Sequence, residues 1–373
     1  MRIGINGQRL LLDKLAGAEL YTVNIIKGFA KVDLQNQYIV YLTTVPEDAF
    51  WHDLVGNNPN LSYKVVRKLG LWTQFGLAFE LLAHPVDVFF SAVHTFPIIR
   101  HPKTKYVGMI HGLEYRFNDY RGFFKKLFKG KPEWFVCMFS NIIITPSEAT
   151  KNEILKRKWV LSAKKIHVVS EGVSPLYTKK SLEETQAVQK KYDLNGQKYL
   201  TFISTVQPRK NIPGMIQGFS MALKEANLPN VKLLIIGKKG WFYEKSLEAP
   251  IKYGVEKNVI FAGYLPAVDV ATLLSGSVGF VNVSFEEGFG LPLLEAMNCE
   301  VPCVVSDIPA FREVGGENVL YCDPNNPEDI KNKLLVLLQD KYSEVMVTKA
   351  KQQAGTHTWE NTAQKTLEIF NKA

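Results

Sequence analysis

The stretch Gly279–Glu295 reads GFVNVSFEEGFGLPLLE. Its first five residues form a short apolar run that is typical of a buried strand. Gly288 and Gly290 allow a tight turn and a close approach of ligand to backbone. Pro292 suits the first turn of a helix, because backbone N–H groups there have no hydrogen-bond partner within the helix and the missing N–H of proline costs nothing. We therefore predict a strand, a glycine-containing loop and a helix from about Leu291, whose first amides attract anions.

Two glutamates flank this turn, with seven residues between them. Glu287 is expected in the loop and Glu295 on the early helix. Carboxylates accept hydrogen bonds from the paired hydroxyls of a sugar or ribose, while helix amides suit a diphosphate. The alternative is that Glu295 is solvated and that the glycines serve only the turn. We favour ligand binding because strand, glycines, proline and acids all point to one kind of ligand.

Further short strands alternate with longer helical patterns along the whole chain. This alternation indicates βαβ units and parallel sheets, and the apolar, non-alternating strands fit sheets covered on both faces. The predicted strands are Arg2–Ile5, Tyr38–Leu42, Leu61–Val66, Val86–Phe90, Tyr106–Ile110, Asn141–Thr145, Ile166–Val169, Tyr199–Ile203, Leu233–Ile236, Val259–Phe261, Gly279–Val283, Cys303–Val305 and Val319–Tyr321.

The length of 373 residues indicates two domains. With 46% hydrophobic and 22% charged residues, the composition excludes a disordered, collagen-like or disulfide-scaffold chain. The polar stretch 178–198, with a helix expected at Leu182–Tyr192, is interpreted as a linker region. The predicted fold is α/β, with two doubly wound Rossmann-like domains, 1–178 and 179–357, facing a central cleft. In such folds ligands bind beyond the carboxyl ends of the strands.

We expect a cytoplasmic protein. The N-terminus enters a strand pattern at once, unlike a signal peptide, and no apolar stretch reaches the roughly 20 residues of a bilayer span. The four cysteines show no spacing that is typical of zinc or redox sites. They are interpreted as buried thiols, and no metal site is predicted.

The net charge of +9 comes from the first half of the chain. Residues 1–178 hold 23 Lys+Arg and 14 Asp+Glu, whereas residues 179–373 hold 22 of each. A basic half beside a neutral half indicates that one domain faces an anionic partner. Nucleic acid, a membrane surface and a phosphorylated substrate all fit this description.

A second candidate corner follows the strand Tyr199–Ile203. Arg209 and Lys210 precede an amphipathic helix expected at Met215–Leu223. Two adjacent cations there could neutralise a pyrophosphate, with arginine binding it bidentately and lysine acting as a point charge. The alternative is that both cations are simply solvated at this corner of the fold. The stretch from Glu287 to Glu295 favours ligand binding instead.

Two weaker candidates lie in the N-terminal half. His111 follows the strand Tyr106–Ile110 and precedes a glycine, so it could face a ligand or serve the structure only. Gly17 stands before a helix expected at Leu20–Phe29 and could let a ligand approach the backbone. The surrounding loop matches neither a Walker A motif nor a dinucleotide-binding fingerprint.

These motifs resemble those of the retaining glycosyltransferases of family 4, also called group 1, and in particular the mannosyltransferases. The resemblance is densest over Lys198–Asp329, in SFEEGFGLPLLEAM, VVSDIPAFREVGG and NVLYCDP. Supporting stretches are AGAELYT, VGMIHGLEYR, NIIITPSEAT, SEGVSPLY, QPRKN and THTWENTAQKTLEIF. It implies the GT-B fold, with an acceptor-side N-terminal domain, a donor-binding C-terminal domain and a last helix, 358–373, that crosses back to the N-terminal domain.

The resemblance also implies a role for each candidate residue. Arg209 and Lys210 match the pair that binds the donor diphosphate. Glu287 matches the glutamate that holds the transferred sugar, and Glu295 matches the glutamate that holds the ribose. His111 matches a histidine that contacts the sugar, and Gly17 matches a loop glycine near donor or acceptor. Gly288, Phe289, Gly290 and Leu291 would contact the donor through their backbone. One departure is that Ala16-Gly17 stands where the family often has two glycines.

The implied reaction moves a hexose from a nucleotide diphosphate sugar to a hydroxyl with retention at the anomeric carbon. GDP-mannose is the first expectation for the donor and a UDP-hexose the second. The acceptor would be a glycan or lipid-linked glycan in cell-surface polysaccharide synthesis. We expect the leaving phosphate to help deprotonate the acceptor, and we expect no metal or other cofactor to be required.

The stretch Tyr115–Lys131 mixes aromatic residues with six cations. Such a mixture suits an anionic membrane surface, and equally a core-packed helix with a solvated basic face. We hypothesise that it docks the protein at the inner face of the membrane. Two other functions stay open: a nucleotide-sugar enzyme without transfer, such as an epimerase, and a non-catalytic nucleic-acid binder, for which no motif is found.

Overall fold

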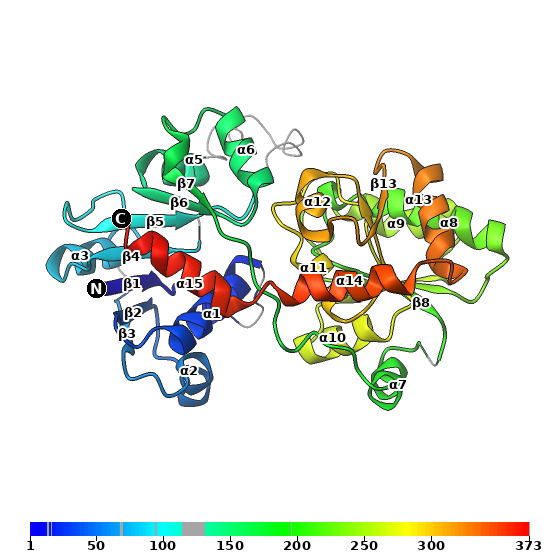
Figure 1. Ribbon diagram of the computed structural model, residues 1–373, viewed down its shortest axis with the longest axis horizontal. Coiled ribbons are helices and arrows are strands. Elements are labelled where there is room, and N and C mark those ends of the chain that lie inside the picture. Colours follow the sequence, from blue (N-terminus) through cyan, green and yellow to red (C-terminus); the bar gives the residue numbers. More distant parts are fainter. Residues whose placement is uncertain are drawn as a thin grey trace. The chain divides into compact units, whose positions relative to one another are not determined.

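The computed structural model describes residues 1–12, 15, 17–67, 70–93, 95–113, 131–194 and 196–372. Its contacts divide the chain into two units. The N-terminal unit holds Met1–Gly172 and His357–Ala373, and the C-terminal unit holds Val173–Thr356. Each unit is built on one parallel sheet with helices on both faces (Figure 1).

The sheet of the N-terminal unit has seven strands in the order β3-β2-β1-β4-β5-β6-β7. All neighbours pair in parallel, as β1 does with β2 and β4. The strands are β1 (Arg2–Asn6), β2 (Gln37–Leu42), β3 (Leu61–Val65), β4 (Val88–Ser91), β5 (Lys105–Met109), β6 (Ile142–Thr145) and β7 (Ile166–Val168).

Apolar residues line both faces of this sheet. On β2, Val40 belongs to the core on one face and its neighbour Tyr41 to the core on the other. On β4, Phe90 and Phe89 divide in the same way. Successive side chains point to opposite faces of a strand, so the run of apolar residues in the sequence follows directly from cover on both faces.

The cover comes from the intervening helices and from the end of the chain. These helices are α1 (Gly17–Val32), α2 (Asp48–Val55), α3 (Gly76–Ala83), α5 (Lys131–Phe139), α6 (Glu148–Lys156), the 3₁₀ turn η2 (Ala163–Lys165) and α15 (Trp359–Phe370).

The last helix returns to the N-terminal unit, as the resemblance implies. α15 lies along α1 (Figure 1). The approach is close at Gly28, where an added Cβ would lie 2.7 Å from the carbonyl oxygen of Trp359. Phe370 is buried, with its ring centroid 5.9 Å from that of Phe29 and 5.4 Å from that of Phe90. The end of the chain therefore belongs to the first core.

The sheet of the C-terminal unit has six strands in the order β10-β9-β8-β11-β12-β13. They are also parallel, and β8 and β11 are the central pair. The strands are β8 (Tyr199–Ile203), β9 (Lys232–Ile236), β10 (Val259–Gly263), β11 (Gly279–Asn282), β12 (Cys303–Ser306) and β13 (Leu320–Cys322).

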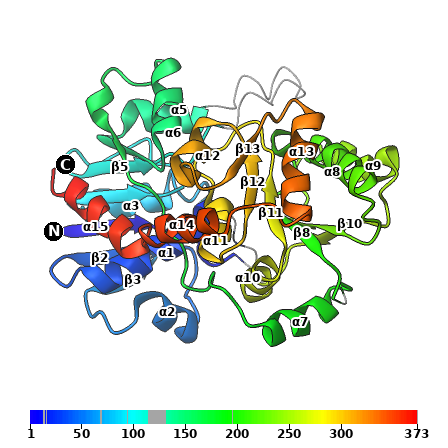
Figure 2. The same cartoon turned by 45° about the vertical axis from the view of Figure 1, so that its right-hand side comes forward.

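Helices again cover both faces of this second sheet, and Figure 2 shows several of them around it. Residues of α8, α9 and α13 share one core, and residues of α11, α12 and α14 share another. The elements are α7 (Leu182–Lys191), the 3₁₀ turn η3 (Pro208–Lys210), α8 (Ile212–Ala226), α9 (Glu244–Tyr253), α10 (Ala267–Ser275), α11 (Leu291–Asn298), α12 (Pro309–Gly315), α13 (Pro327–Leu338) and α14 (Glu344–Gly355).

The thirteen predicted strands are all present, with ends that differ by at most two residues from the predicted ones. The helix expected in the linker region is α7, which Ser181 and Glu184 begin with a reciprocal capping box. This region is part of the C-terminal unit, because Lys191 and Tyr192 both donate to the carboxylate of Asp269 at the start of α10. The contacts divide the units at Gly172 and Val173, six residues before the expected position.

The place of Phe370 in the first core gives a stability prediction. We expect Phe370→Ala to lower the free energy of unfolding by about 3 to 5 kcal/mol, because it leaves a cavity among aromatic rings. Urea denaturation followed by tryptophan fluorescence measures the change. Leu161→Ala in the same unit is the control, since Leu161 is 98% exposed and its loss should change stability by less than about 0.5 kcal/mol. Equal effects of the two substitutions would contradict the packing of α15.

Candidate functional site

The predicted strand–loop–helix unit is present at β11 and α11. Gly290 has a φ of 112° and stands at the N-cap of α11. An added Cβ there would lie 2.8 Å from the Phe311 ring, so the turn requires a glycine. Pro292 occupies the first turn of α11. The helix therefore starts at Leu291 as predicted, with its amide end at the carboxyl edge of the sheet.

An ion cluster lies at this edge. Arg209 Nη1 is 2.9 Å from Glu287 Oε2, and Lys210 Nζ is 2.6 Å from Glu287 Oε1. Ser284 Oγ donates to the same Oε1 at 2.8 Å. The side chains of Arg209, Lys210 and Glu287 are 14%, 6% and 9% exposed. The structure thus brings together the three residues that the sequence placed after two different strands.

Backbone contacts hold the two loops of the cluster together. Phe285 N donates to the carbonyl oxygen of Arg209 at 2.9 Å, and Arg209 Nη1 donates to the carbonyl oxygen of Glu286 at 3.0 Å. Asn211, next to the cations, adopts a left-handed conformation that ends η3 and begins α8. The cations are therefore held by backbone geometry as well as by charge.

The charges determine the protonation state of Glu287. Burial by itself would raise the pKa of this carboxyl, but the adjacent Lys210 and Arg209 outweigh it and lower the pKa to about 2. At neutral pH Glu287 is a carboxylate that accepts hydrogen bonds and has no proton to give. It is also a weak base. The cluster is thus an electrostatic and hydrogen-bonding site.

The second glutamate is buried as well. Glu295 on α11 is 8% exposed, so it is not the solvated first-turn residue of the alternative interpretation. Burial, and then the charge and hydrogen bond of Glu295, raise the pKa of Tyr177. Asn298 Nδ2 also donates to the carbonyl oxygen of Tyr177 at 2.6 Å. Tyr177 is a neighbour that sequence reasoning missed, although it lies within the quoted stretch SEGVSPLY.

Of the other donor residues proposed in this loop, Phe289 packs its ring into the core around α11 and is 6% exposed. The backbone of Gly288, Phe289 and Leu291 lies between Glu287 and Glu295. Their expected contacts with a donor remain a prediction.

His111 lies at the carboxyl edge of the other sheet, two residues after the end of β5. Its Nε2 is 2.9 Å from the carbonyl oxygen of Ala92, and its Nδ1 is 3.2 Å from Glu171 Oε1. Both of these partners are hydrogen-bond acceptors. The Tyr21 ring packs edge-on against the imidazole at 4.9 Å. Its role towards a sugar remains a prediction.

Glu171 is a second residue that sequence reasoning missed. It is 7% exposed and follows β7, whereas Ala92 follows β4, so three strand ends meet at His111. Burial, and then the charge of Glu171, raise the pKa of Tyr21. Only the order of strands in the sheet brings these residues together. No local sequence pattern predicts that they are neighbours.

Gly17 is the first residue of α1, one turn before Tyr21. An added Cβ at Gly17 would meet no described atom within 4 Å. Nearby, Arg9 pairs with the buried Glu19 at 2.7 Å. Among the described residues, none therefore fills the space beside Gly17 at the start of the helix.

Other sequence expectations concern cysteines, metals and membranes. All four cysteines are buried free thiols. Within the described ranges, no three His, Cys, Asp or Glu side chains come together as metal ligands, and no helix combines the length and apolarity needed to cross a bilayer. The hypothesis for Tyr115–Lys131 lies outside the described residues, apart from Lys131, where α5 begins.

The low pKa of Glu287 gives a prediction about pH. Because the pKa of the Glu287 carboxyl is lower in the folded than in the unfolded chain, its ionisation stabilises the fold at pH values above the ordinary carboxyl pKa. This stabilisation is lost as the pH falls to the pKa that the carboxyl has in the folded state. Between pH 4.5 and 2, the free energy of unfolding of the native chain should fall by about 3 kcal/mol more than that of Glu287→Gln. Urea denaturation at a series of pH values measures both.

Glu317→Gln is the matched control, because this side chain is 93% exposed. It should keep the native pH dependence. An identical pH dependence for Glu287→Gln and the native chain would show that the ion cluster does not hold Glu287 ionised.

Two family models match the chain. The model described as Glycosyltransferase Family 4 matches residues 15–175, and that described as Glycosyl transferases group 1 matches residues 184–353. Among curated relatives, O-antigen chain mannosyltransferase B of Escherichia coli is 34% identical over 233 residues, which are 62% of this chain and 60% of that protein. Serotype-specific mannosyltransferase WbdA of Escherichia coli is 27% identical over 62% of this chain and 29% of that protein. The matched region thus spans less than two thirds of these relatives.

Solved structures agree on the fold. HepE of Anabaena, in complex with UDP and glucose, has a TM-score of 0.75 at 17% identity, with all of both chains covered. WaaG, a glycosyltransferase involved in lipopolysaccharide biosynthesis, has a TM-score of 0.74 at 15% identity, again over both whole chains. These structures have the GT-B fold, with two Rossmann-like domains. The chain thus contains a family 4 glycosyltransferase domain over residues 15–175, followed by a group 1 glycosyltransferase domain over residues 184–353.

Proposed function

We propose that this protein transfers a hexose, most simply mannose, from a nucleotide diphosphate sugar to a hydroxyl of a glycan or lipid-linked glycan, with retention of configuration. The observation that carries the proposal is the buried cluster of Arg209, Lys210 and Glu287 beside the amide end of α11. The relatives named as O-antigen mannosyltransferases support the sugar and the polysaccharide context.

The cations act on the leaving group. When the bond between the anomeric carbon and the phosphate breaks, negative charge grows on the diphosphate. Arg209 and Lys210, together with the first amides of α11, are positioned to stabilise that charge in a poorly hydrated site, where fixed donors are most effective. Arginine can bind two phosphate oxygens, whereas lysine supplies a point charge.

Glu287 positions the sugar instead of attacking it. Its carboxylate already accepts hydrogen bonds from Lys210 and Ser284, and its pKa of about 2 makes it a weak base. It can still accept from hydroxyls of the transferred sugar, because each carboxylate oxygen has two lone pairs. The proton of the acceptor hydroxyl then passes to the leaving phosphate on the same face of the sugar. This step accounts for retention without a protein nucleophile.

In this proposal Glu295 binds the ribose of the nucleotide. Its burial beside Tyr177 fixes the carboxylate on α11, eight positions after Glu287. The nucleoside and the transferred sugar are then held by two glutamates on either side of the same glycine turn. For the two candidates in the N-terminal unit, we propose that His111 contacts the transferred sugar and that Gly17 lies near the donor phosphate or the acceptor.

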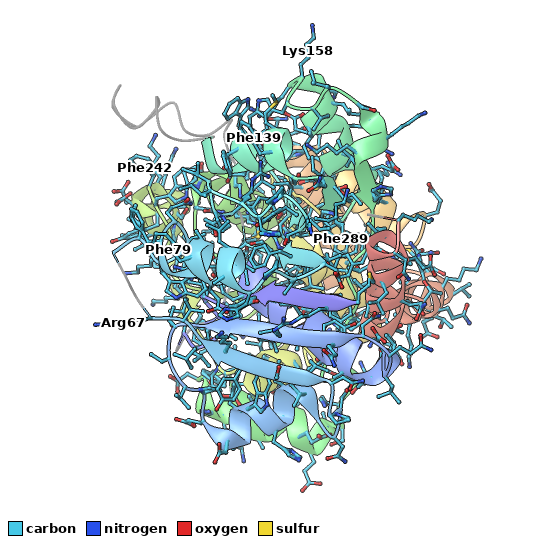
Figure 3. The ribbon with its side chains drawn as sticks, turned by 90° about the vertical axis from the view of Figure 1, so that its left-hand side faces the viewer. Arg67, Phe79, Phe139, Lys158, Phe242 and Phe289 are labelled. Carbon is cyan, nitrogen blue, oxygen red and sulfur yellow. The ribbon has the colours of Figure 1, made fainter. Side chains whose placement is uncertain are left out.

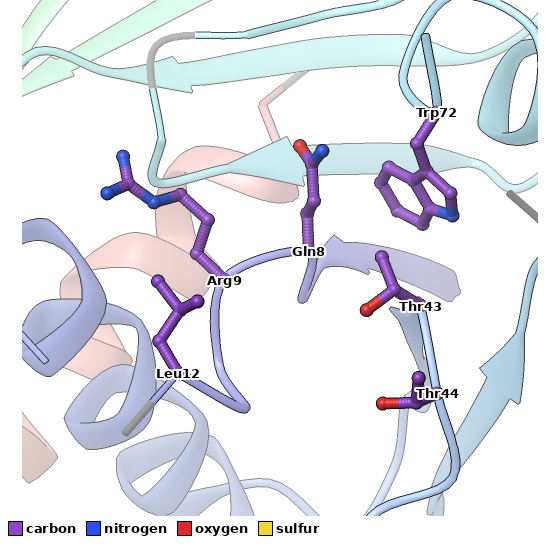
Figure 4. A pocket seen from close by; sticks show the side chains of 6 residues that line it. All are labelled: Gln8, Arg9, Leu12, Thr43, Thr44 and Trp72. Carbon is purple, nitrogen blue, oxygen red and sulfur yellow. The ribbon is translucent and has the colours of Figure 1, made fainter. Parts of the chain in front are cut away.

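The acceptor side is assigned to a cavity of about 600 Å³ in the N-terminal unit (Figure 4). It is lined by Gln8, Arg9, Leu12, Thr43, Thr44 and Trp72. These residues follow β1, β2 and β3, so the cavity lies at the carboxyl edge where doubly wound folds bind ligands. Thr73 Oγ1 donates to Gln8 Oε1 at 3.1 Å. Hydroxyl, amide and indole groups together suit a saccharide.

We place the reaction in the cytoplasm as part of the proposal, because four buried free thiols fit a reducing compartment. The similarity in fold to HepE, solved in complex with UDP and glucose, supports a nucleotide sugar as the donor. No metal enters the proposed steps, since the cations and the helix amides supply the positive charge.

The donor base is the first point to test. We expect GDP to raise the thermal unfolding temperature more than UDP or ADP, and GDP-mannose to be turned over. A nucleotide at 100 times its dissociation constant stabilises the fold by about 2.7 kcal/mol. Differential scanning fluorimetry with the three nucleotides measures the shift. A larger shift with UDP would move the proposal to a UDP-hexose, as in HepE, and no shift with any of them would overturn it.

The cation pair is tested by its effect on the rate. Arg209→Ala and Lys210→Ala should each lower kcat by about 10²- to 10³-fold, because each removes a donor that stabilises the developing charge. Lys198→Ala is the control, since this exposed lysine pairs with Asp340 at the other end of β8. NMR of the product should show the same anomeric configuration as the donor. Inversion would refute the same-face mechanism, and an epimerised donor without transfer would refute transfer itself.

A further inference from the structure

Three segments of the N-terminal unit carry large exposed apolar side chains, namely the start of α3 with the loop before it, the loop between β4 and β5, and α5. They are Leu71, Phe75, Phe79, Ile98, Ile99, Trp134 and Phe139, between 41% and 69% exposed. Single exposed apolar residues are common on proteins, but a group of them marks an interaction surface. We call this group the α3–α5 face. Figure 3 labels Phe79 and Phe139 on it.

Hydrogen bonds join the first two segments of this face. Gln74, just before α3, donates from Nε2 to the carbonyl oxygen of Phe96 at 2.9 Å. Its Oε1 accepts from the N–H of Ile98 at 2.8 Å. The start of α3, with Phe75 and Phe79 one turn apart, is therefore fixed beside the exposed pair Ile98 and Ile99.

Arg100 joins the third segment. Its guanidinium lies 5.8 Å from the centre of the Phe139 ring and donates from Nη1 to the carbonyl oxygen of the same residue. Trp134 packs edge-on against Phe139 with ring centres 6.0 Å apart. Hydrogen bonds and a cation–π contact thus connect the three segments.

Basic side chains accompany the apolar ones. Lys103 and Lys105 are exposed and follow Ile98 and Ile99 in the same segment, and Arg67 is exposed next to the start of α3. Lys165 donates to the carbonyl oxygens at the end of α5.

The nearby carboxylates are engaged within the protein. Glu80 on α3 pairs with Lys64 at 2.6 Å, and Asp87 accepts from the N–H of Arg2 at 2.7 Å. Glu133 on α5 is half-buried and has contacts of its own. The α3–α5 face therefore presents exposed cations beside apolar side chains, and one of its carboxylates, Glu80, is paired with a lysine.

We propose that the α3–α5 face docks this protein on an anionic lipid bilayer. Aromatic and aliphatic side chains enter the headgroup region, and Lys and Arg at its border bind anionic headgroups. The charge is what selects a bilayer over a second copy of the chain, because two copies would bring like charges together. The proposal deepens the proposed function, since a lipid-linked acceptor lies at such a surface. It stands on residues other than the segment Tyr115–Lys131.

The experiment measures flotation of the full-length protein with two kinds of vesicle. One kind is made of phosphatidylcholine alone. In the other kind, about two in five lipids are the anionic phosphatidylglycerol. The native chain should float with the anionic vesicles and much less with the neutral ones. Ile98→Glu with Ile99→Glu should reduce binding at least about tenfold, because it places two charges in the apolar layer.

A second pair of substitutions isolates the charge. Lys103→Glu with Lys105→Glu should lower binding to anionic vesicles by about tenfold or more, because each cation near the surface contributes to attraction. Binding to neutral vesicles should stay unchanged. Ile251→Glu is the matched control, since this residue is 70% exposed in the C-terminal unit. All variants should keep the native unfolding temperature.

The outcomes separate docking from catalysis. Vesicle binding is measured without donor, so a failure of sugar transfer leaves the docking result untouched. Conversely, the Ile98/Ile99 variant should transfer to a short water-soluble acceptor at the native rate. Three results would overturn the docking proposal: no binding to anionic vesicles, binding that both pairs of substitutions leave intact, or a dimer in solution that Ile98→Glu with Ile99→Glu dissociates.

Discussion

The buried ion cluster of Glu287 with Arg209 and Lys210 is the interaction on which the C-terminal unit's proposed chemistry depends. Desolvation of three charges is costly, several kcal/mol for each ion. The cost is offset because each carboxylate oxygen faces one cation, at 2.9 and 2.6 Å, and because Ser284 adds a hydroxyl donor. The cluster joins the loop after β8 to the loop after β11, so it shapes the edge of the central strand pair.

In the proposed function, the same cluster binds the anionic part of the donor. A diphosphate would find two cations that the fold has already desolvated and oriented, so little reorganisation would accompany binding. Glu287 remains ionised at neutral pH, because the two adjacent cations lower its pKa to about 2. The glycine at the N-cap of α11 then lets the helix amides approach the same place.

The N-terminal unit depends on a different constraint, the closure of its core by the end of the chain. α15 packs Phe370 between aromatic rings of α1 and β4 and places Trp359 against Tyr21 at 5.4 Å. Tyr21 in turn packs against His111. A helix more than 240 residues away in sequence thus supports the ring at the strand ends, which connects the stability of this core to the candidate site.

Local pattern was enough for the thirteen strands, the glycine turn before α11 and the pair of cations after β8. Each of these features depends on neighbouring residues in the sequence. The strands are apolar runs, the turn needs a positive φ that glycine adopts easily, and the cations follow the end of a strand. The partners of those residues were not readable in the same way. That Glu287 binds both Arg209 and Lys210, that Glu171 meets His111 and that Tyr177 lies against Glu295 all depend on which strands and loops become neighbours. Strand order and long-range packing decide this, because they bring together residues that are 60 to 118 positions apart.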